Sequence, residues 1–168
     1  MTGTSERYVL DTNVFVEASR RYYSLDFAKP FWDGLIKYSE KGILCSIDKV
    51  LSELQDGDDE LKVWAETEYK EFFISTKNQK VIEAYAQIVK WAQAQSQFNQ
   101  KAKDKFMQIN NTDTWVIAYA LTNNLTVVTH EIYSHNVQKN IPIPNVCRAF
   151  GIKDCNTFEM IRKISFKF

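Results

Sequence analysis

Near the start of the chain stands Tyr8-Val9-Leu10-Asp11-Thr12-Asn13-Val14, the stretch that decides the fold. It is a short apolar run that ends directly in an aspartate, Asp11. Buried parallel strands are continuous Val, Ile and Leu runs of this kind, and in open α/β sheets ligands bind at the carboxyl ends of such strands. We therefore expect Asp11 at the carboxyl end of a buried strand. Taken alone, it is equally well explained as a helix cap.

The length and composition of the chain indicate one soluble domain over residues 1–168. A chain of 168 residues can bury about two-thirds of its unfolded surface without disulfides or a structural metal. The 21 basic and 21 acidic residues cancel, so the net charge points to neither a nucleic acid nor a membrane. Cys45, Cys147 and Cys155 lack a C-x-x-C spacing, which argues against disulfides and zinc. No apolar run is long enough to cross a bilayer, and we expect a cytoplasmic protein without a membrane partner.

Short apolar runs alternate with amphipathic segments along the chain. Strands are predicted at residues 8–10, 43–47 and 125–129, and residues 72–74 are either a short strand or a packed turn. Helices are predicted at 26–39, 58–70, 78–95 and 112–123, and shorter ones are expected after Asn13 and Asp48, each of which can act as a cap. A loop with Pro142 and Pro144 precedes a small helix at 146–150, and Asn156 opens a last helix. This alternation predicts an α/β fold, a three-layer α/β/α sandwich with a mostly parallel central sheet.

Three acidic residues occur where the pattern favours apolar ones. Asp113 precedes Ile117 by four positions, so it projects from the helical face that should pack on the sheet. Glu53 lies three positions after Val50, at the edge of an apolar stripe, and Asp11 ends the first strand. Each has an ordinary explanation: a cap for Asp11, a first-turn acid for Asp113 and a solvated residue for Glu53. The α/β layout nevertheless places all three around one crevice.

Acids that converge in a partly dry pocket repel one another unless a cation lies between them. Ligand sets made only of oxygen atoms select Mg²⁺ or Mn²⁺ over zinc. Such an ion binds phosphate oxygens and lowers the pKa of an attacking water. The acids therefore point to hydrolysis of a phosphodiester.

Four motifs, in this order, resemble those of the PIN-domain ribonucleases. They are Val9-Leu10-Asp11-Thr12-Asn13, Ser52-Glu53-Leu54, Asp113-Thr114-Trp115-Val116-Ile117-Ala118 and Leu125-Thr126-Val127-Val128-Thr129-His130-Glu131. The tail is similar to a PIN subgroup of VapC-like proteins, through Ile141-Pro142-Ile143-Pro144-Asn145-Val146-Cys147 and Phe150-Gly151-Ile152. The resemblance implies a three-layer sandwich whose acids bind one or two Mg²⁺ or Mn²⁺ ions for RNA cleavage.

The resemblance also implies roles for individual residues. Three residues match the core acids of the family: Asp11, Glu53 and Asp113. Glu131 stands where the family usually has aspartate, after a threonine that Thr129 matches. These four acids are the expected metal ligands and catalytic residues, with Asn13 and Thr129 in support. Tyr133 stands where many members have a further acid.

The expected function is that of an endoribonuclease toxin, with a cognate antitoxin protein and a homodimeric assembly as the family implies. The core acids would hold the ion and orient a water for in-line attack, leaving a 3′-hydroxyl and a 5′-phosphate. The alternative is a catalytically weakened PIN domain that binds RNA or a protein, which Tyr133 and the lack of a strongly basic surface favour. A DNA flap nuclease would need a threading arch, for which residues 93–111 offer only a small clamp.

Two further patterns carry separate predictions. His130-Glu131-Ile132-Tyr133-Ser134-His135 looks like the zinc-protease motif H-E-x-x-H, but its second histidine is one position late and cannot share a zinc on a helix. Lys101, Lys103 and Lys105 are the nearest approach to a basic patch. A solvated surface is the commoner role for such lysines, and a rim that contacts phosphate is the alternative.

Overall fold

The computed structural model describes residues 6–57 and 59–167. Within them the chain forms a five-stranded sheet in the order β3-β2-β1-β4-β5, and each pair of neighbouring strands is parallel. The strands are β1 (Tyr8–Leu10), β2 (Leu44–Ile47), β3 (Phe73–Ile74), β4 (Thr126–Val128) and β5 (Asp154–Cys155). The prediction of a mostly parallel sheet is confirmed, and the segment at 72–74 contributes a strand.

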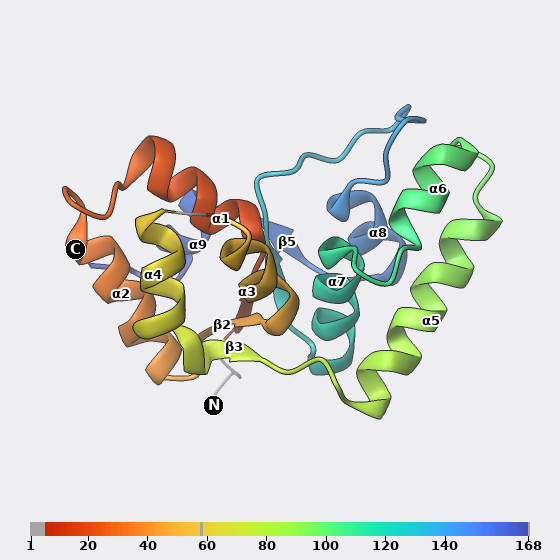
Figure 1. Ribbon diagram of the computed structural model, residues 1–168. Helices are drawn as coiled ribbons and strands as arrows, with labels where there is room; N and C mark the ends of the chain where they lie inside the picture. Colours follow the sequence, from red (N-terminus) through yellow and green to blue (C-terminus); the bar gives the residue numbers. More distant parts are fainter. Residues whose placement is uncertain (1–5, 58, 168) are drawn as a thin grey trace, which may run out of the picture.

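Helices cover both faces of this sheet (Figure 1). One face carries α1 (Thr12–Glu17), α2 (Lys29–Glu40), α3 (Asp48–Gln55), α4 (Glu60–Thr67) and α9 (Thr157–Lys163). The other carries α5 (Gln79–Ala94), α6 (Gln100–Phe106), α7 (Thr112–Asn123) and α8 (Ile143–Phe150). The π-helix η1 (Ala18–Tyr22) continues α1, and the 3-10 helix η2 (Lys70–Phe72) leads into β3. The predicted three-layer α/β/α arrangement is thus confirmed.

The order of the strands places a topological switch point between β1 and β4. From β1 the chain moves outward through β2 to β3, then crosses back by way of α5–α7 to β4 on the other side of β1. Right-handed crossovers require the two directions of travel to use opposite faces, which explains the two helical layers. Ligands in such sheets bind outside the carboxyl ends of the strands at the switch point. Asp11 and Glu131 follow these two strands.

Three segments differ from the sequence prediction. The loop expected around Pro142 and Pro144 instead starts α8, with Pro142 as N-cap and Pro144 in the first turn, where a missing backbone N–H is tolerated. The strand β5 was not expected, because two residues are too short to show a period. The helix α6 was not expected either, because its polar composition resembles that of a loop.

Aromatic packing joins the helices of one face to the sheet through Phe15 of α1. The Phe15 side chain is fully buried. Its ring centroid lies 6.1 Å from that of Trp64, 5.6 Å from that of Tyr69 and 5.8 Å from that of Phe73. Phe15, four positions after Asp11, therefore packs α1 against α4 and β3. This packing also fixes the direction in which the chain leaves β1.

Replacing this ring tests its contribution to stability. Phe15→Ala leaves a cavity among three other rings and should lower the free energy of unfolding by about 3–5 kcal/mol. Phe27→Ala is the control, because Phe27 is 88% exposed and its removal should cost less than about 0.5 kcal/mol. Urea unfolding followed by tryptophan fluorescence measures both. Equal losses in the two variants would contradict the assignment of Phe15 to the core.

Candidate metal centre

Asp11 lies at the carboxyl end of β1 and is only 2% exposed. Its Oδ1 accepts a hydrogen bond of 2.8 Å from the backbone N–H of Thr12, which makes Asp11 the N-cap of α1. The expectation that Asn13 caps this helix is therefore wrong, because the helix already begins at Thr12, directly after Asp11. The Oδ2 of Asp11 accepts a bond of 3.0 Å from the Thr129 hydroxyl. The cap interpretation thus holds, and it leaves the carboxylate beside the end of β4.

Asp113 lies in the first turn of α7 and is half-buried. The side chain of Asn111 caps the helix by accepting a bond of 3.1 Å from the backbone N–H of Asp113. Val116 and Ile117 in the next turn are completely buried. The prediction from the spacing of Asp113 and Ile117 is therefore confirmed, since Asp113 projects from a helix that packs on the sheet.

Glu131 lies in the loop after β4 and is also half-buried. Its backbone N–H donates a hydrogen bond of 3.2 Å to the Thr129 hydroxyl. Its Oε1 accepts a bond of 3.4 Å from the backbone N–H of Ile143, the first residue of α8. A carboxylate at a helix N-terminus is favoured by the helix dipole. The start of α8 thus orients the side chain of Glu131.

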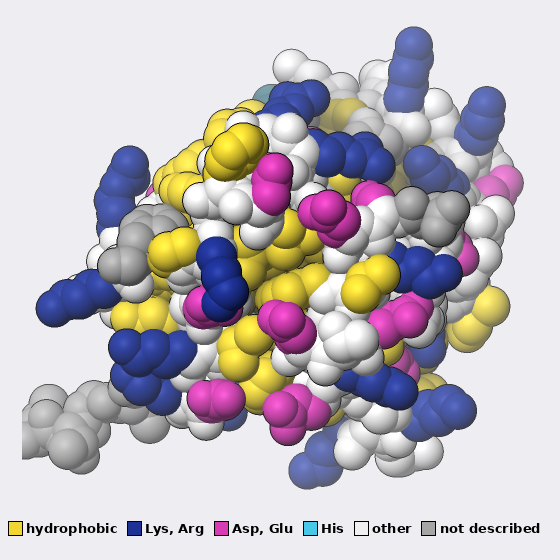
Figure 2. All heavy atoms as spheres, turned by 60° about the vertical axis from the view of Figure 1, so that its left-hand side comes forward, with side chains coloured by type: hydrophobic (Ala, Val, Ile, Leu, Met, Phe, Trp, Pro, Cys, Tyr) yellow, Lys and Arg dark blue, Asp and Glu magenta, His cyan; other side chains and the backbone are white. Residues whose placement is uncertain are grey.

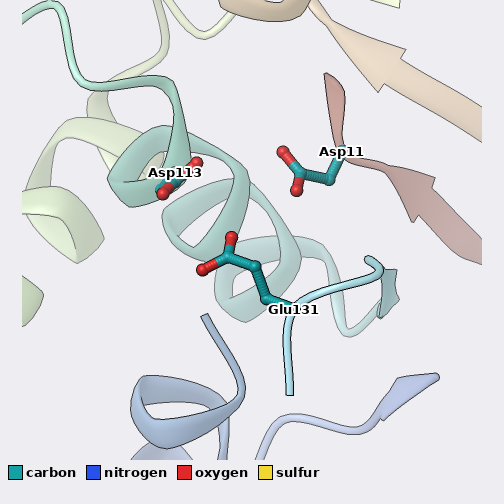
Figure 3. A group of neighbouring side chains, drawn as sticks. All are labelled: Asp11, Asp113 and Glu131. Atoms are coloured by element: carbon teal, nitrogen blue, oxygen red, sulfur yellow. The ribbon is translucent and has the colours of Figure 1, made fainter. Parts of the chain in front are cut away.

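These three carboxylates converge. One oxygen of each of Asp11, Asp113 and Glu131 lies within 4.8 Å of the oxygens of the other two. Figure 3 shows the three side chains pointing toward a common space from the end of β1, the start of α7 and the loop after β4. Asp11 is therefore brought to one point with two acids that follow it by 102 and 120 positions in the sequence.

Two polar side chains connect the elements that carry the acids. The Thr129 hydroxyl donates to Asp11 and accepts bonds of 3.2 Å from the Asn13 amide and from the backbone N–H of Glu131. The Asn13 carbonyl oxygen accepts a bond of 3.0 Å from the backbone N–H of His130. Thr129 is itself buried, at 2% exposure. The structure therefore places both expected supporting residues between the end of β1 and the loop that carries Glu131.

The convergence of the acids changes their protonation. Burial, together with the charges of Asp113 and Glu131, raises the pKa of Asp11 well above its ordinary value. Burial and the charge of Glu53 raise the pKa of Asp113 to about 6. Burial and the charge of Asp113 raise the pKa of Glu131 to about 7. Without a cation, the site therefore binds protons at pH values where isolated carboxyl groups have lost them.

Glu53 is placed differently from the other expected ligands. It lies on α3 with an exposed side chain and does not belong to the group of oxygens within 4.8 Å. Its charge nevertheless acts on Asp113, so the two side chains face the same region. At Tyr133, where a further acid was considered, the guanidinium of Arg148 lies 3.7 Å from the centre of the phenol ring, a cation–π pair.

The site also opens on a cavity that the sequence did not reveal. Its volume is about 140 Å³, and besides Asp113 and Glu131 its lining includes Lys105, Asn111 and Asn140. Asn111 had a readable signal, since an asparagine directly before a helix is a common cap. Asn140 and Lys105 had none that links them to the acids, because they approach only through the packing of α6 and the loop before α8.

The donor set fits a hard divalent cation. It consists of carboxylate oxygens alone, which suit Mg²⁺ or Mn²⁺ rather than zinc. The pKa values of the three acids are raised by burial and by each other's charges, and a bound cation would offset this repulsion. The zinc-protease pattern has no support, because His130 and His135 lie outside helices. The Nε2 of His130 lies 2.8 Å from the Thr157 hydroxyl, with which it shares a hydrogen bond.

The fold and the site together define a three-layer α/β protein with an acidic cluster at the carboxyl edge of its parallel sheet. Residues 8–168 match the family model of a domain of unknown function, DUF4411, and the chain belongs to this family. No curated protein matches the chain significantly. None of the helices that the structure describes combines the length and apolar character of a membrane span.

Three solved structures share this fold. VapBC2 from Rickettsia felis, bound to a DNA fragment from their promoter, has 18% identity and a TM-score of 0.53, covering 89% of this chain and 97% of that one. FitAcB from Neisseria gonorrhoeae has 17% identity and a TM-score of 0.53, with 90% and 98% covered. VapBC-1 from nontypeable Haemophilus influenzae has 18% identity and a TM-score of 0.50, with 89% and 96% covered. At these identities the likeness concerns the fold.

The raised pKa values predict how stability depends on pH. Acids whose folded pKa is higher than the unfolded one bind protons on folding, so they stabilise the fold at low pH and lose this effect as pH rises. With pKa values of about 6 for Asp113 and about 7 for Glu131, stability in EDTA should fall between about pH 4 and pH 7. Thermal unfolding measures this, at about 2–4 °C per kcal/mol for a chain of this length.

The matched control for the pH series is the double variant Asp113→Asn with Glu131→Gln, which removes both titrating groups. Its melting temperature should change less between pH 4 and pH 7 than that of the unsubstituted protein. Saturating Mn²⁺ at pH 7.5 should also raise the melting temperature of the unsubstituted protein and not that of the variant. A pH profile that is the same in both proteins would refute the electrostatic coupling.

Proposed function

We propose that this protein is a Mg²⁺- or Mn²⁺-dependent endoribonuclease that acts as the toxin of a toxin–antitoxin pair. The observation that carries the proposal is the convergence of Asp11, Asp113 and Glu131 at the switch point of the sheet. The shared fold with the VapBC and FitAcB structures supports the same class of protein. Membership of DUF4411 is neutral, since the family is described by its unknown function.

The residues of the site divide the work between them. Asp11, Asp113 and Glu131 would hold the ion, and Glu53 would approach from the rim of the site, where its exposed carboxylate is free to reorient. The ion, when bound, neutralises phosphate charge and lowers the pKa of the attacking water. Thr129 and Asn13 keep Asp11 and Glu131 in register through their hydrogen bonds. The burial of Asp11 excludes bulk water from one side of the site.

The proposed reaction is hydrolysis by in-line displacement. The oxygen of a water attacks phosphorus, and the bond between phosphorus and the 3′ oxygen breaks. The water gives up a proton and the 3′ oxygen takes one up, so the products are a 3′-hydroxyl and a 5′-phosphate. The substrate is RNA, and water is the only other reactant that is consumed.

A protein partner is supported both by the surface of the protein and by its similarity to the VapBC and FitAcB structures. Figure 2 shows hydrophobic side chains gathered at the centre of the face that carries α2 and α4, with Asp and Glu side chains beside them. Val63 on α4 is 61% exposed, and Phe27, just before α2, is 88% exposed. Exposed apolar groups of this kind mark interaction surfaces. We assign the cognate antitoxin to this face, and the protein is proposed to act as a homodimer.

A second candidate function is an RNA- or protein-binding domain without activity. It is favoured by the pair of Tyr133 and Arg148, which occupies the position where a further acid would strengthen metal binding. The two candidates differ in one property, since a domain with a ruined site takes up no metal. Calorimetric titration with Mn²⁺ therefore separates them, and metal binding that disappears in Asp11→Asn would reject the inactive domain.

The substitution Asp11→Asn tests the site directly. It keeps the shape of the side chain but removes a charge from the centre of the acidic cluster. We expect cleavage of labelled single-stranded RNA in Mn²⁺ to fall by about 100-fold or more, because even partners of metal ligands contribute 10–100-fold. Denaturing gel electrophoresis measures the cleavage, and the 5′-phosphate on the product is checked by digestion with an exonuclease that requires a 5′-phosphate.

Glu40→Gln is the control for this experiment. Glu40 is exposed at the end of α2, just before β2 begins and therefore at the opposite edge of the sheet from the acids. Its variant should cleave RNA and bind Mn²⁺ as the unsubstituted protein does. Undiminished cleavage by Asp11→Asn would refute the assignment of the site.

The toxin role has its own test. Induced expression in bacteria should arrest growth, and Asp11→Asn should relieve the arrest while the protein still accumulates. Glu40→Gln should arrest growth as strongly as the unsubstituted chain, since it leaves the acids intact. Colony counts after induction measure the effect. Equal arrest by Asp11→Asn would separate toxicity from the acidic site and contradict this role.

A further inference from the structure

The three lysines of α6 have different surroundings in the structure. Lys103 donates a hydrogen bond of 3.1 Å from Nζ to the backbone oxygen of Gln93 and is therefore turned toward α5. Lys101 is exposed one turn before Lys105. Lys105 lines the cavity of about 140 Å³ that also contains Asp113 and Glu131. The sequence left all three as either a solvated surface or a rim that contacts phosphate, and the fold distinguishes Lys105 from the others.

The backbone of Lys105 is tied to the backbone of Asp113 through one side chain. The amide nitrogen of Asn111 donates to the backbone oxygens of Lys105, at 3.1 Å, and Phe106, at 3.3 Å. The amide oxygen of Asn111 accepts from the backbone N–H of Asp113. The Thr114 hydroxyl adds a bond of 2.8 Å to the oxygen of Phe106. The end of α6 is therefore held in place relative to the start of α7.

The ammonium group of Lys105 faces the acids without being paired to either. Its charge acts on the carboxyl groups of both Asp113 and Glu131. Within the described residues, however, it makes no ion pair shorter than 4.0 Å, whereas the ion pairs that are present involve other lysines and one arginine. A cation held at the mouth of an acidic site, and not engaged by it, is available to a further anion.

Charge balance identifies that anion. Asp11, Asp113 and Glu131 with one divalent ion carry a net charge of −1, and a phosphodiester adds another −1. A substrate would therefore meet a site of its own sign unless a protein cation accompanies it. Preorganised cations at a phosphoryl group are a main source of stabilisation when charge accumulates in the transition state. Lys105 is the cation that lines the same cavity as the acids.

We propose that Lys105 binds the scissile phosphate, with Nζ donating a hydrogen bond to a non-bridging oxygen of the phosphodiester. The proposal rests on the endoribonuclease function proposed above and adds a substrate-contacting residue to it. In this arrangement Asn111 is a positioning residue, because it acts by holding α6 against the start of α7. The other two lysines have no such role.

The test uses the full chain with Lys105→Gln and Lys105→Arg. The glutamine variant keeps most of the side-chain length but removes the charge, and its single-turnover cleavage of RNA at saturating Mn²⁺ should fall by about 10-fold or more. The arginine variant should retain most of the activity. Affinity for Mn²⁺, measured by calorimetry without RNA, should stay the same or increase in Lys105→Gln, because a positive charge near the acids is removed.

Lys103→Gln and Lys101→Gln are the matched controls on the same helix and should cleave within about 2-fold of the unsubstituted protein, because neither lysine lines the cavity with the acids. Thermal unfolding of each variant checks that the fold is intact. Full cleavage by Lys105→Gln would overturn the proposal while leaving the endoribonuclease function standing. Parallel loss of Mn²⁺ binding and cleavage would also overturn it, since Lys105 would then shape the metal site. Absence of cleavage by the unsubstituted protein would overturn both proposals.

Discussion

Electrostatic repulsion among three carboxylates is the constraint on which the rest of this structure depends. Asp11, Asp113 and Glu131 come within 4.8 Å of one another in a partly buried place, and this proximity costs free energy that folding must supply elsewhere. The protein offsets part of the cost with donors aimed at individual oxygens, from the Thr12 amide, the Thr129 hydroxyl and the Ile143 amide. Protons offset another part, as the raised pKa values show. A fold that maintains such a cluster is suited to a cation.

The geometry of the cluster follows from how parallel strands end. Leu10 pairs with Val128 in the register of β1 and β4, so Asp11 and Thr129 leave the sheet side by side. The Thr129 hydroxyl joins three partners there, and Asn13 extends the connection to the loop with Glu131. The pairing of β1 with β4 thus holds the two segments that follow these strands side by side, and the hydrogen bonds of Thr129 and Asn13 join them. Asp113 is added from the opposite layer, because α7 packs against both β1 and β4.

The periphery of the site carries charges of both signs. Glu53 contributes negative charge from an exposed position on α3. Tyr133, which stands where a further acid was considered, forms a cation–π pair with Arg148. On the other side, α6 brings a lysine to the cavity, and Asn111 fixes that helix to the start of α7. The fold is shared with proteins of very different sequence, as the solved structures at 17–18% identity show.

What the sequence by itself determined is what depends on local pattern. The apolar run before Asp11, the spacing of Asp113 to Ile117 and the alternation of strands and helices were enough for the α/β class, the parallel sheet and the candidate acids. What only the tertiary structure decided depends on contacts between distant segments. These are the contact of Asp11 with Thr129, the two-residue strand β5, the rim position of Glu53 and the approach of Lys105 to the acids. A polar helix such as α6 and a two-residue strand lack a hydrophobic period, so their places are set by packing and strand pairing rather than by their own residues.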